Sequence, residues 1–195
     1  MNIVNKEKEK YEKVHSSMEY GLGLRQVNDL KNLNFEFSNR FAEIVLDSKN
    51  CLDIACGGGT VMDYVDTLGC TPTGIDISSN AIQKVSNKFD TFVGSCHQLP
   101  FEDNKFDLVY FLDGMEHIPV EIEIDSLKEA FRVSNKYVCH AIAMGSSIRN
   151  GVELHINRKS QNEWKSLINP IAVEFEYKED MFYVRNNTVY LIYKK

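Results

Sequence analysis

The fold of this chain follows from the segment Cys51-Leu-Asp-Ile-Ala-Cys-Gly-Gly-Gly-Thr60, in which a short apolar run ends in a cluster of glycines. About twenty residues later a second apolar run, Gly74-Ile-Asp-Ile-Ser78, ends in a carboxylate. Glycines let a backbone approach a ligand closely, and an acid at the end of the neighbouring strand accepts hydrogen bonds from ribose hydroxyls. The two segments therefore predict an adenosine-containing cofactor at the carboxyl edge of a parallel sheet.

The length and composition indicate one globular domain. The chain has 195 residues and 43% hydrophobic content, which suffices for one substantial core but not for two independent ones. Its 22 basic and 28 acidic residues give a net charge of -6, which provides no general attraction to phosphate backbones or anionic lipids. We therefore expect neither a nucleic acid nor a membrane as a partner.

The cysteines and the N-terminus indicate a cytoplasmic protein. The cysteines are odd in number, form no Cys-x-x-Cys pair and lie mostly in apolar runs, so we expect buried, reduced thiols and no metal site. The charged run 6–13 has no apolar segment behind it, and no window has the length of a membrane span. The cysteines are Cys51, Cys56, Cys70, Cys96 and Cys139.

Strand-like and helix-like segments alternate along the chain, which predicts an α/β fold. The expected strands are residues 51–55, 72–77, 91–94, 106–112, 137–144, 171–177 and 188–194. The expected helices lie within 1–47, with a break at 21–23 and a second helix over 35–46, and then over 61–69, 79–89, 119–132 and 160–168. The last two strand-like runs are expected to pair as an antiparallel hairpin at the sheet edge.

Five segments stand in an order that resembles the successive motifs of class I S-adenosylmethionine-dependent methyltransferases. The segments are 52–59, 74–78, 94–101, 106–118 and 132–133. The resemblance covers roughly residues 45–145 and implies a Rossmann-like sheet of seven strands, mostly parallel with strand seven antiparallel, and helices on both faces. It also implies S-adenosylmethionine as the cofactor and methyl transfer as the reaction.

The same resemblance implies a division of the single domain, residues 1–195, into three parts. Residues 1–47 would form an N-terminal helical lid, hinged near Gly21 and Gly23. Residues 48–145 would form the cofactor-binding core. Residues 146–195 would supply an acceptor-side segment and the C-terminal hairpin.

Individual motif positions carry implied roles toward the cofactor. Asp53 resembles the acid that orders the glycine loop and reaches the cofactor's amino group. Asp76 resembles the acid that binds the ribose diol, and Ile77 the apolar residue that lies against adenine. The implied cofactor-binding residues are Asp53, Ala55, Cys56, Gly57, Gly59, Asp76, Ile77, Ser95, Cys96, His97, Leu112 and Tyr20.

Two positions depart from the family pattern. Ala55 stands where many relatives have the first glycine of the loop, so this backbone position must tolerate a methyl group. Ser95 stands where a carboxylate usually meets the adenine amino group, and His97 is placed to compensate for the weaker acceptor.

Catalysis requires little special chemistry from the protein, because the sulfonium already makes its methyl group electrophilic. Well-oriented reactants lower a barrier by roughly 7–11 kcal/mol. A hydroxyl acceptor must also lose a proton, and a positioned base adds about 10²- to 10⁴-fold. The candidate catalytic residues are His155, His117 and Asp113, whereas His140 is expected in the core.

The acceptor is expected to be a small molecule that is methylated on oxygen. The pattern Leu154-His-Ile-Asn157 followed by Trp164 is similar to that of bacterial methyltransferases of sugars and surface polysaccharides. One alternative is a non-catalytic S-adenosylmethionine-binding partner or regulatory protein. Another is an NAD-dependent oxidoreductase, although its Gly-x-Gly-x-x-Gly spacing would place the third glycine at Thr60.

Overall fold

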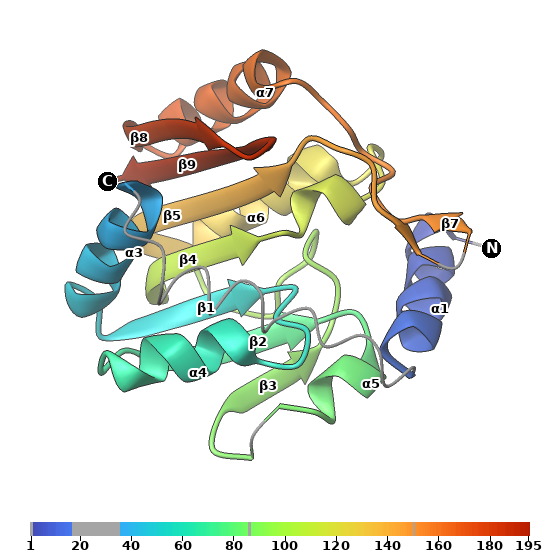
Figure 1. The fold of residues 1–195 in the computed structure, drawn as a ribbon. Coiled ribbons are helices and arrows are strands. Elements are labelled where there is room, and N and C mark those ends of the chain that lie inside the picture. The colour runs from blue at the N-terminus through green and yellow to red at the C-terminus, as the bar shows by residue number, and fades with distance from the viewer. Residues whose placement is uncertain (1, 17–35, 86, 150) are drawn as a thin grey trace.

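The computed structural model describes residues 2–16, 36–85, 87–149 and 151–195, and a seven-stranded sheet lies at its centre (Figure 1). Its strands are β1 Asn50–Ile54, β2 Thr71–Asp76, β3 Asp90–Val93, β4 Phe106–Leu112, β5 Ser134–Ala143, β8 Lys178–Arg185 and β9 Thr188–Lys194. A separate hairpin joins β6 Ile148–Arg149 and β7 Val152–Glu153. The helices are α1 Ile3–Ser16, α3 Glu36–Leu46, α4 Thr60–Thr67, α5 Ser79–Ile82, the 3-10 turn η1 Met115–His117, α6 Glu123–Val133 and α7 Gln161–Glu174.

The strand order is β3-β2-β1-β4-β5-β9-β8. The strands from β3 to β5 pair in parallel, and β9 pairs antiparallel with both β5 and β8. The expected sheet, mostly parallel with its last strand antiparallel, is confirmed. The order reverses beside β1, which lies between β2 and β4, and in open α/β sheets ligands bind outside the carboxyl ends of the strands at this switch point.

Two hydrophobic cores lie on opposite faces of the sheet, and β4 contributes to both. Leu108, Tyr110 and Leu112 pack with side chains of α3 and α4. Val109 and Phe111 point to the other face and pack with side chains of α6 and α7. Strands buried on both faces have nearly continuous apolar runs, which is why the sequence identifies this strand with its observed bounds.

The expected strand over 171–177 is wrong, because α7 continues to Glu174. Buried Ile171 extends the helical stripe of Trp164 and Ile168, which packs against the sheet. Pro170 lies inside this helix. A proline cannot donate the backbone hydrogen bond of a helix interior, yet α7 continues through this position.

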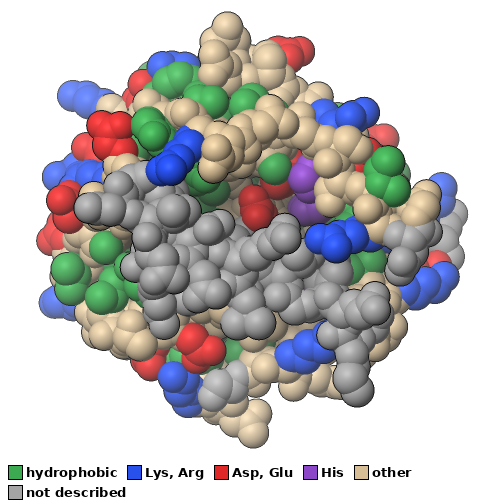
Figure 2. Space-filling model, in the orientation of Figure 1, with side chains coloured by type: hydrophobic (Ala, Val, Ile, Leu, Met, Phe, Trp, Pro, Cys, Tyr) green, Lys and Arg blue, Asp and Glu red, His purple; other side chains and the backbone are tan. Residues whose placement is uncertain are grey.

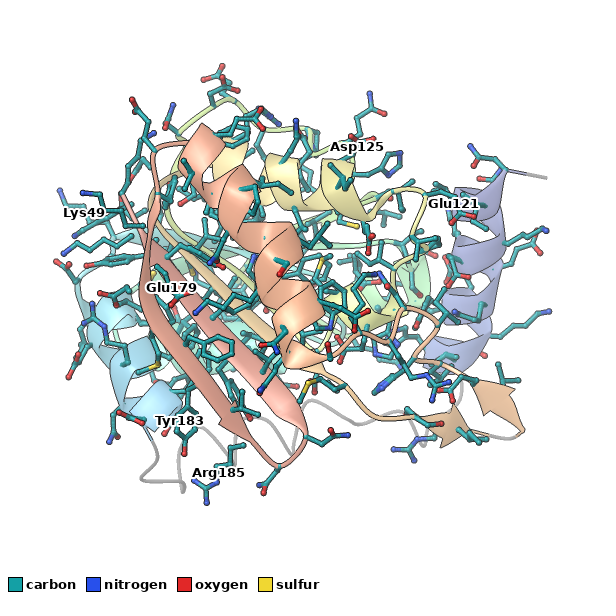
Figure 3. The ribbon with its side chains drawn as sticks, turned by 90° about the horizontal axis from the view of Figure 1, so that it is seen from above. Lys49, Glu121, Asp125, Glu179, Tyr183 and Arg185 are labelled. Atoms are coloured by element: carbon teal, nitrogen blue, oxygen red, sulfur yellow. The ribbon has the colours of Figure 1, made fainter. Side chains whose placement is uncertain are left out.

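The expected antiparallel hairpin is present, but its first strand is β8. Asn186 and Asn187 join β8 to β9 at φ 50° and 60°, the positive values that a two-residue hairpin turn of this type requires. Lys165 of α7 forms an ion pair with Glu179 of β8 at 2.9 Å, at the edge seen from above in Figure 3. The hairpin therefore closes the sheet on the side away from β3.

The two described N-terminal helices occupy different places (Figure 1). Phe37 and Phe41 of α3 are buried in the core, whereas α1 lies beside α5 and the β6–β7 hairpin at the carboxyl edge of the sheet. The expected hinge at Gly21 and Gly23 lies outside the described residues. Among the helices that the structure describes, none is both long enough and apolar enough to cross a bilayer.

Candidate functional site

A cavity of about 420 Å³ opens at the carboxyl ends of β1, β2 and β4. Its walls come from the loops that follow these strands, from one face of α1 and from the segment around β6. Figure 2 shows acidic and histidine side chains inside a hollow of this face. The cavity therefore lies at the switch point of the sheet, where the sequence places a ligand.

The glycine loop after β1 turns sharply through three residues with left-handed backbone. Ala55, Gly57 and Gly59 have φ values of 59°, 53° and 82°. A Cβ atom at Gly59 would lie 2.9 Å from Cγ1 of Val85, so only glycine fits there. At Ala55 the left-handed conformation costs about 1–2 kcal/mol, because the Cβ atom crowds the following carbonyl. Ala55, which replaces the glycine of the family pattern, is thus a strained residue that lines the cavity.

Asp76 at the end of β2 holds this loop in place. One carboxylate oxygen accepts a hydrogen bond from the Gly57 amide at 3.0 Å, and the other accepts one from the Ser78 amide at 2.8 Å. The side chain is buried, and burial raises its pKa, while the two amides act in the opposite direction. Each carboxylate oxygen has a second lone pair, so Asp76 can also accept hydrogen bonds from a ligand.

Asp53 ends β1 and is 4% exposed. Burial raises the pKa of this carboxyl well above its usual range, the Tyr110 hydroxyl acts in the opposite direction, and the negative charge of Asp76 adds to the increase. A buried carboxyl that lines a cavity gains most from a cationic or hydrogen-bonding ligand group. Asp53 is therefore suited to an amino group.

Ser95, Cys96 and His97 follow β3. The Ser95 hydroxyl lies 2.7 Å from Nδ1 of His97, and Sγ of Cys96 lies 3.2 Å from the Ser126 hydroxyl. Ser95 and Cys96 line the cavity, and His97 lies behind Ser95 as its hydrogen-bond partner.

Most of the sequence-predicted cofactor residues meet at this one cavity. Gly59 and His97 do not line the cavity but contact Val85 and Ser95 respectively. Tyr20 lies outside the described residues. The predicted residues that line the cavity are Asp53, Ala55, Cys56, Gly57, Asp76, Ile77, Ser95, Cys96 and Leu112.

The helix α1 is fixed at the cavity by Glu12, which the sequence analysis did not single out. Its carboxylate accepts hydrogen bonds from the Ser79 amide at 2.8 Å, the Asn80 amide at 3.0 Å and the Ser78 hydroxyl at 3.0 Å, at the N-terminus of α5. The Ser79 amide is the main cause that lowers the pKa of Glu12 to about 2. The Lys84 ammonium also donates to the carbonyl of His15.

One face of α1 lines the cavity through Val4, Glu7, Tyr11 and His15. Their spacing of three, four and four residues is that of a single helical face, and this spacing can be counted in the sequence from Val4 to His15. Burial and the charge of Lys84 lower the pKa of His15 to about 4.

The three candidate catalytic residues line the same cavity. Asp113 is exposed, has φ 52° and follows β4 directly. The rings of His117 and His155 meet edge to face with centroids 4.7 Å apart. His140, by contrast, is fully buried in the core, where burial lowers its pKa to about 3.

Both cavity histidines have their Nδ1 atoms beside a backbone carbonyl. Nδ1 of His117 lies 2.9 Å from the Leu154 oxygen, and Nδ1 of His155 lies 2.6 Å from the Gly145 oxygen. A carbonyl can only accept, so each Nδ1 carries the proton that it donates, and the Nε2 atoms face away from these carbonyls. Burial is the main cause that lowers the pKa of His117 to about 4.

Glu116 lies next to the two histidines. The sequence analysis did not identify it, because nothing in a single sequence marks a carboxylate as buried. It is fully buried, and one oxygen accepts a hydrogen bond from the Ala143 amide at 3.1 Å. Burial raises its pKa well above the usual range, and the charge of Asp113 adds to this shift.

Comparison with known proteins supports the interpretation of this site. A family model described as a methyltransferase domain matches residues 52–137. The chain is 25% identical over 122 residues to the sterol 4-C-methyltransferase strm-1 of Caenorhabditis elegans, a match that covers 57% of this chain and 36% of the relative. It is 28% identical over 131 residues to a ubiquinone biosynthesis O-methyltransferase of Glaesserella parasuis, with 60% of this chain and 55% of the relative covered. The chain thus spans about a third to a half of the length of these curated relatives.

Among solved structures, the chain is similar in fold to the magnesium protoporphyrin IX methyltransferase of Synechocystis PCC 6803, determined with bound S-adenosylmethionine. The TM-score is 0.63 at 14% identity, and the match covers 100% of both chains. Three observations agree. The glycine loop is hydrogen-bonded to the acid of β2, β9 pairs antiparallel with β5, and the domain model matches the part of the chain that contains this loop. Residues 52–137 thus match a methyltransferase domain, and the chain has the fold of class I S-adenosylmethionine-dependent methyltransferases.

Proposed function

We propose that this protein transfers a methyl group from S-adenosylmethionine to a small-molecule acceptor, on an oxygen atom. The observation that carries the proposal is the hydrogen bond from the Gly57 amide to Asp76, which holds the glycine loop against the end of β2 at the mouth of the cavity. In this geometry the backbone of the glycine loop and the Asp76 carboxylate can contact the same ligand at the switch point of the sheet.

The cavity residues fit the parts of the cofactor. Asp76 would accept hydrogen bonds from the ribose diol, and Ile77 would lie against adenine. Ser95 and the backbone of Cys96 face the edge of the ring. Asp53, buried at the end of β1, takes the amino group of the methionine portion.

The cofactor supplies an electrophilic methyl group, and the protein's own residues orient the acceptor and exclude water. The face of α1 that ends at His15 covers the cavity and removes solvent from the reacting groups. His155, His117 and Asp113 face the acceptor end of the cavity, and a neutral histidine there can take the proton of an acceptor hydroxyl.

The acceptor class is a further part of the proposal. The relatives carry names of sterol, ubiquinone and porphyrin methyltransferases, which act on small molecules and not on a polymer. A sugar or surface-polysaccharide precursor remains our specific suggestion, and it is based on the Leu154–Asn157 pattern. The free cysteines suit the reducing cytoplasm.

Calorimetric titration with S-adenosylhomocysteine tests the proposal. We expect saturable binding of this compound and no heat from NAD. Asp76→Ala should weaken binding at least tenfold, because a charge-assisted hydrogen bond contributes about 1.5–3 kcal/mol. Asp90→Ala, which removes an exposed carboxylate at the other end of β3, is the matched control and should leave the affinity unchanged.

Turnover then distinguishes an enzyme from a binding protein. A panel of hydroxylated small molecules is incubated with S-adenosylmethionine, and formation of S-adenosylhomocysteine is followed. Cofactor binding without turnover on any acceptor would favour the non-catalytic alternative, and a response to NAD alone would favour an oxidoreductase.

A further inference from the structure

A compact set of donor atoms lies at the part of the cavity wall that His117 and His155 form. Glu116, His117 and His155 each present one ligand atom, and these three atoms all lie within 4.8 Å of one another. Glu116 and His117 belong to η1 after β4, whereas His155 follows the β6–β7 hairpin. Two segments that are distant in the sequence thus converge on one point.

The two imidazoles are oriented as metal ligands are. Each Nδ1–H donates to a backbone carbonyl, of Leu154 for His117 and of Gly145 for His155. This second contact fixes the ring and the tautomer and leaves the Nε2 lone pair available, which is the usual arrangement of a metal-bound histidine.

Glu116 provides an independent indication of a ligand. Its side chain is 0% exposed, and one oxygen is used by the Ala143 amide. The other oxygen, Oε2, is buried and accepts no hydrogen bond within the part of the chain that the structure describes. A buried carboxylate oxygen without a partner is unfavourable, and a cation bound to it removes this penalty.

We propose that Glu116, His117 and His155 bind one divalent transition-metal ion, with coordination positions left open toward the acceptor. Two imidazoles and one carboxylate suit Zn²⁺, Fe²⁺ or Mn²⁺, whereas Mg²⁺ and Ca²⁺ prefer oxygen ligands alone. Metal–ligand bonds of about 2.0–2.2 Å hold the donor atoms of one ion within about 4.4 Å of one another, so binding takes at most a small movement of these atoms. His155, which is partly exposed on a loop, has the freedom to make this movement.

The role of the ion in catalysis rests on the proposed function. An acceptor hydroxyl bound to the ion becomes more acidic and releases its proton to water. The oxygen lone pair then forms the new bond to the methyl carbon, while the carbon–sulfur bond breaks and its electron pair stays on sulfur. With both Nε2 atoms bound to the ion, the histidines act as ligands and not as bases.

Metal titration of the tag-free full chain, after treatment with a chelator, tests the site directly. Co²⁺ is the probe because its visible absorption reports coordination by nitrogen and oxygen, and Zn²⁺ retained after dialysis is counted by elemental analysis. We expect one ion per chain. Glu116→Gln, His117→Gln and His155→Gln should each weaken metal binding at least tenfold. Glu121→Gln changes an exposed carboxylate outside the cluster and should leave metal binding unchanged.

Parallel titration with S-adenosylhomocysteine separates this inference from the proposed function. Retained binding of this compound by the three variants shows that they are folded. The metal site is refuted if the folded wild-type chain retains no ion, or if the three variants bind the ion as tightly as the wild type. Metal binding without cofactor binding would instead leave the site standing and contradict the proposed methyl transfer.

Discussion

Ala55 is the residue at which sequence and structure can be compared most directly. The sequence identifies it as a departure from the glycine of the family motif, and the structure gives it φ 59° at the cavity wall. The strain could not be read from the sequence, because an alanine is compatible with several loop conformations. It follows from the position of the neighbouring Gly57 amide, which donates to Asp76.

Replacing Ala55 with glycine should raise the free energy of unfolding by about 0.5–1 kcal/mol. Relief of the left-handed strain contributes about 1–2 kcal/mol, and the greater freedom of glycine in the unfolded chain offsets part of it. Urea unfolding followed by circular dichroism measures the change. Ala42→Gly, at a partly exposed position of α3, is the control, and there the free energy of unfolding should fall by about 1 kcal/mol. A loss of stability in both variants would contradict the strain at Ala55.

At the scale of elements, the carboxylate of Glu12 joins α1 to α5. Glu12 caps α5 from a different helix, so the two helices hold each other at the cavity. The alternating lysines and glutamates of this region predict a solvent-exposed helix. In the structure, only one face of α1 is exposed to solvent. The cavity-lining positions on its other face become visible only when the helical spacing is counted from Val4 to His15.

Glu12→Gln should loosen α1 without unfolding the sheet. The capping amides favour the charged carboxylate, so the amide side chain binds them less well. We expect faster hydrogen exchange of residues 3–16 at pH 7 and weaker binding of S-adenosylhomocysteine. Glu9→Gln, an exposed change on the same helix, is the control and should alter neither quantity. Equal exchange in both variants would show that α1 is held by other contacts.

The same contact has a defined pH dependence. The pKa of Glu12 falls from 4.5 to about 2 in the folded protein. A lowered pKa stabilises the folded form, and this stabilisation is complete above about pH 4.5 and is lost as the pH falls toward about 2. Exchange of α1 in the wild type should therefore increase over this interval, while Glu12→Gln should show less of this pH dependence.

On the scale of the whole molecule, the sequence predicts the layers and the order of elements better than the site. Apolar runs such as 106–112 identify their own strands, and motif order supplies the topology. The convergence of His117 and His155 depends on the path of the β6–β7 hairpin and on the carbonyls of Leu154 and Gly145, which have no sequence signature. The strand expected over 171–177 was wrong for a related reason, because Ile171 packs against the core from α7, and the short apolar run alone does not distinguish a strand from a buried helix.

Cofactor binding should stabilise the whole chain and not only the loops around the cavity. The ends of β1 and β4 help to form the cavity, and both strands contribute side chains to both cores. S-adenosylhomocysteine at a hundred times its Kd should add about 2.7 kcal/mol, which raises the Tm of a domain of this size by about 5–10 °C. Differential scanning calorimetry measures the shift within each variant, so a lower starting stability does not obscure it. Asp76→Ala should show a much smaller shift at the same ligand concentration, and Asp90→Ala the full one. An undiminished shift in Asp76→Ala would mean that the ligand binds elsewhere, because the carboxylate that ties Gly57 to β2 would then make no contact with it.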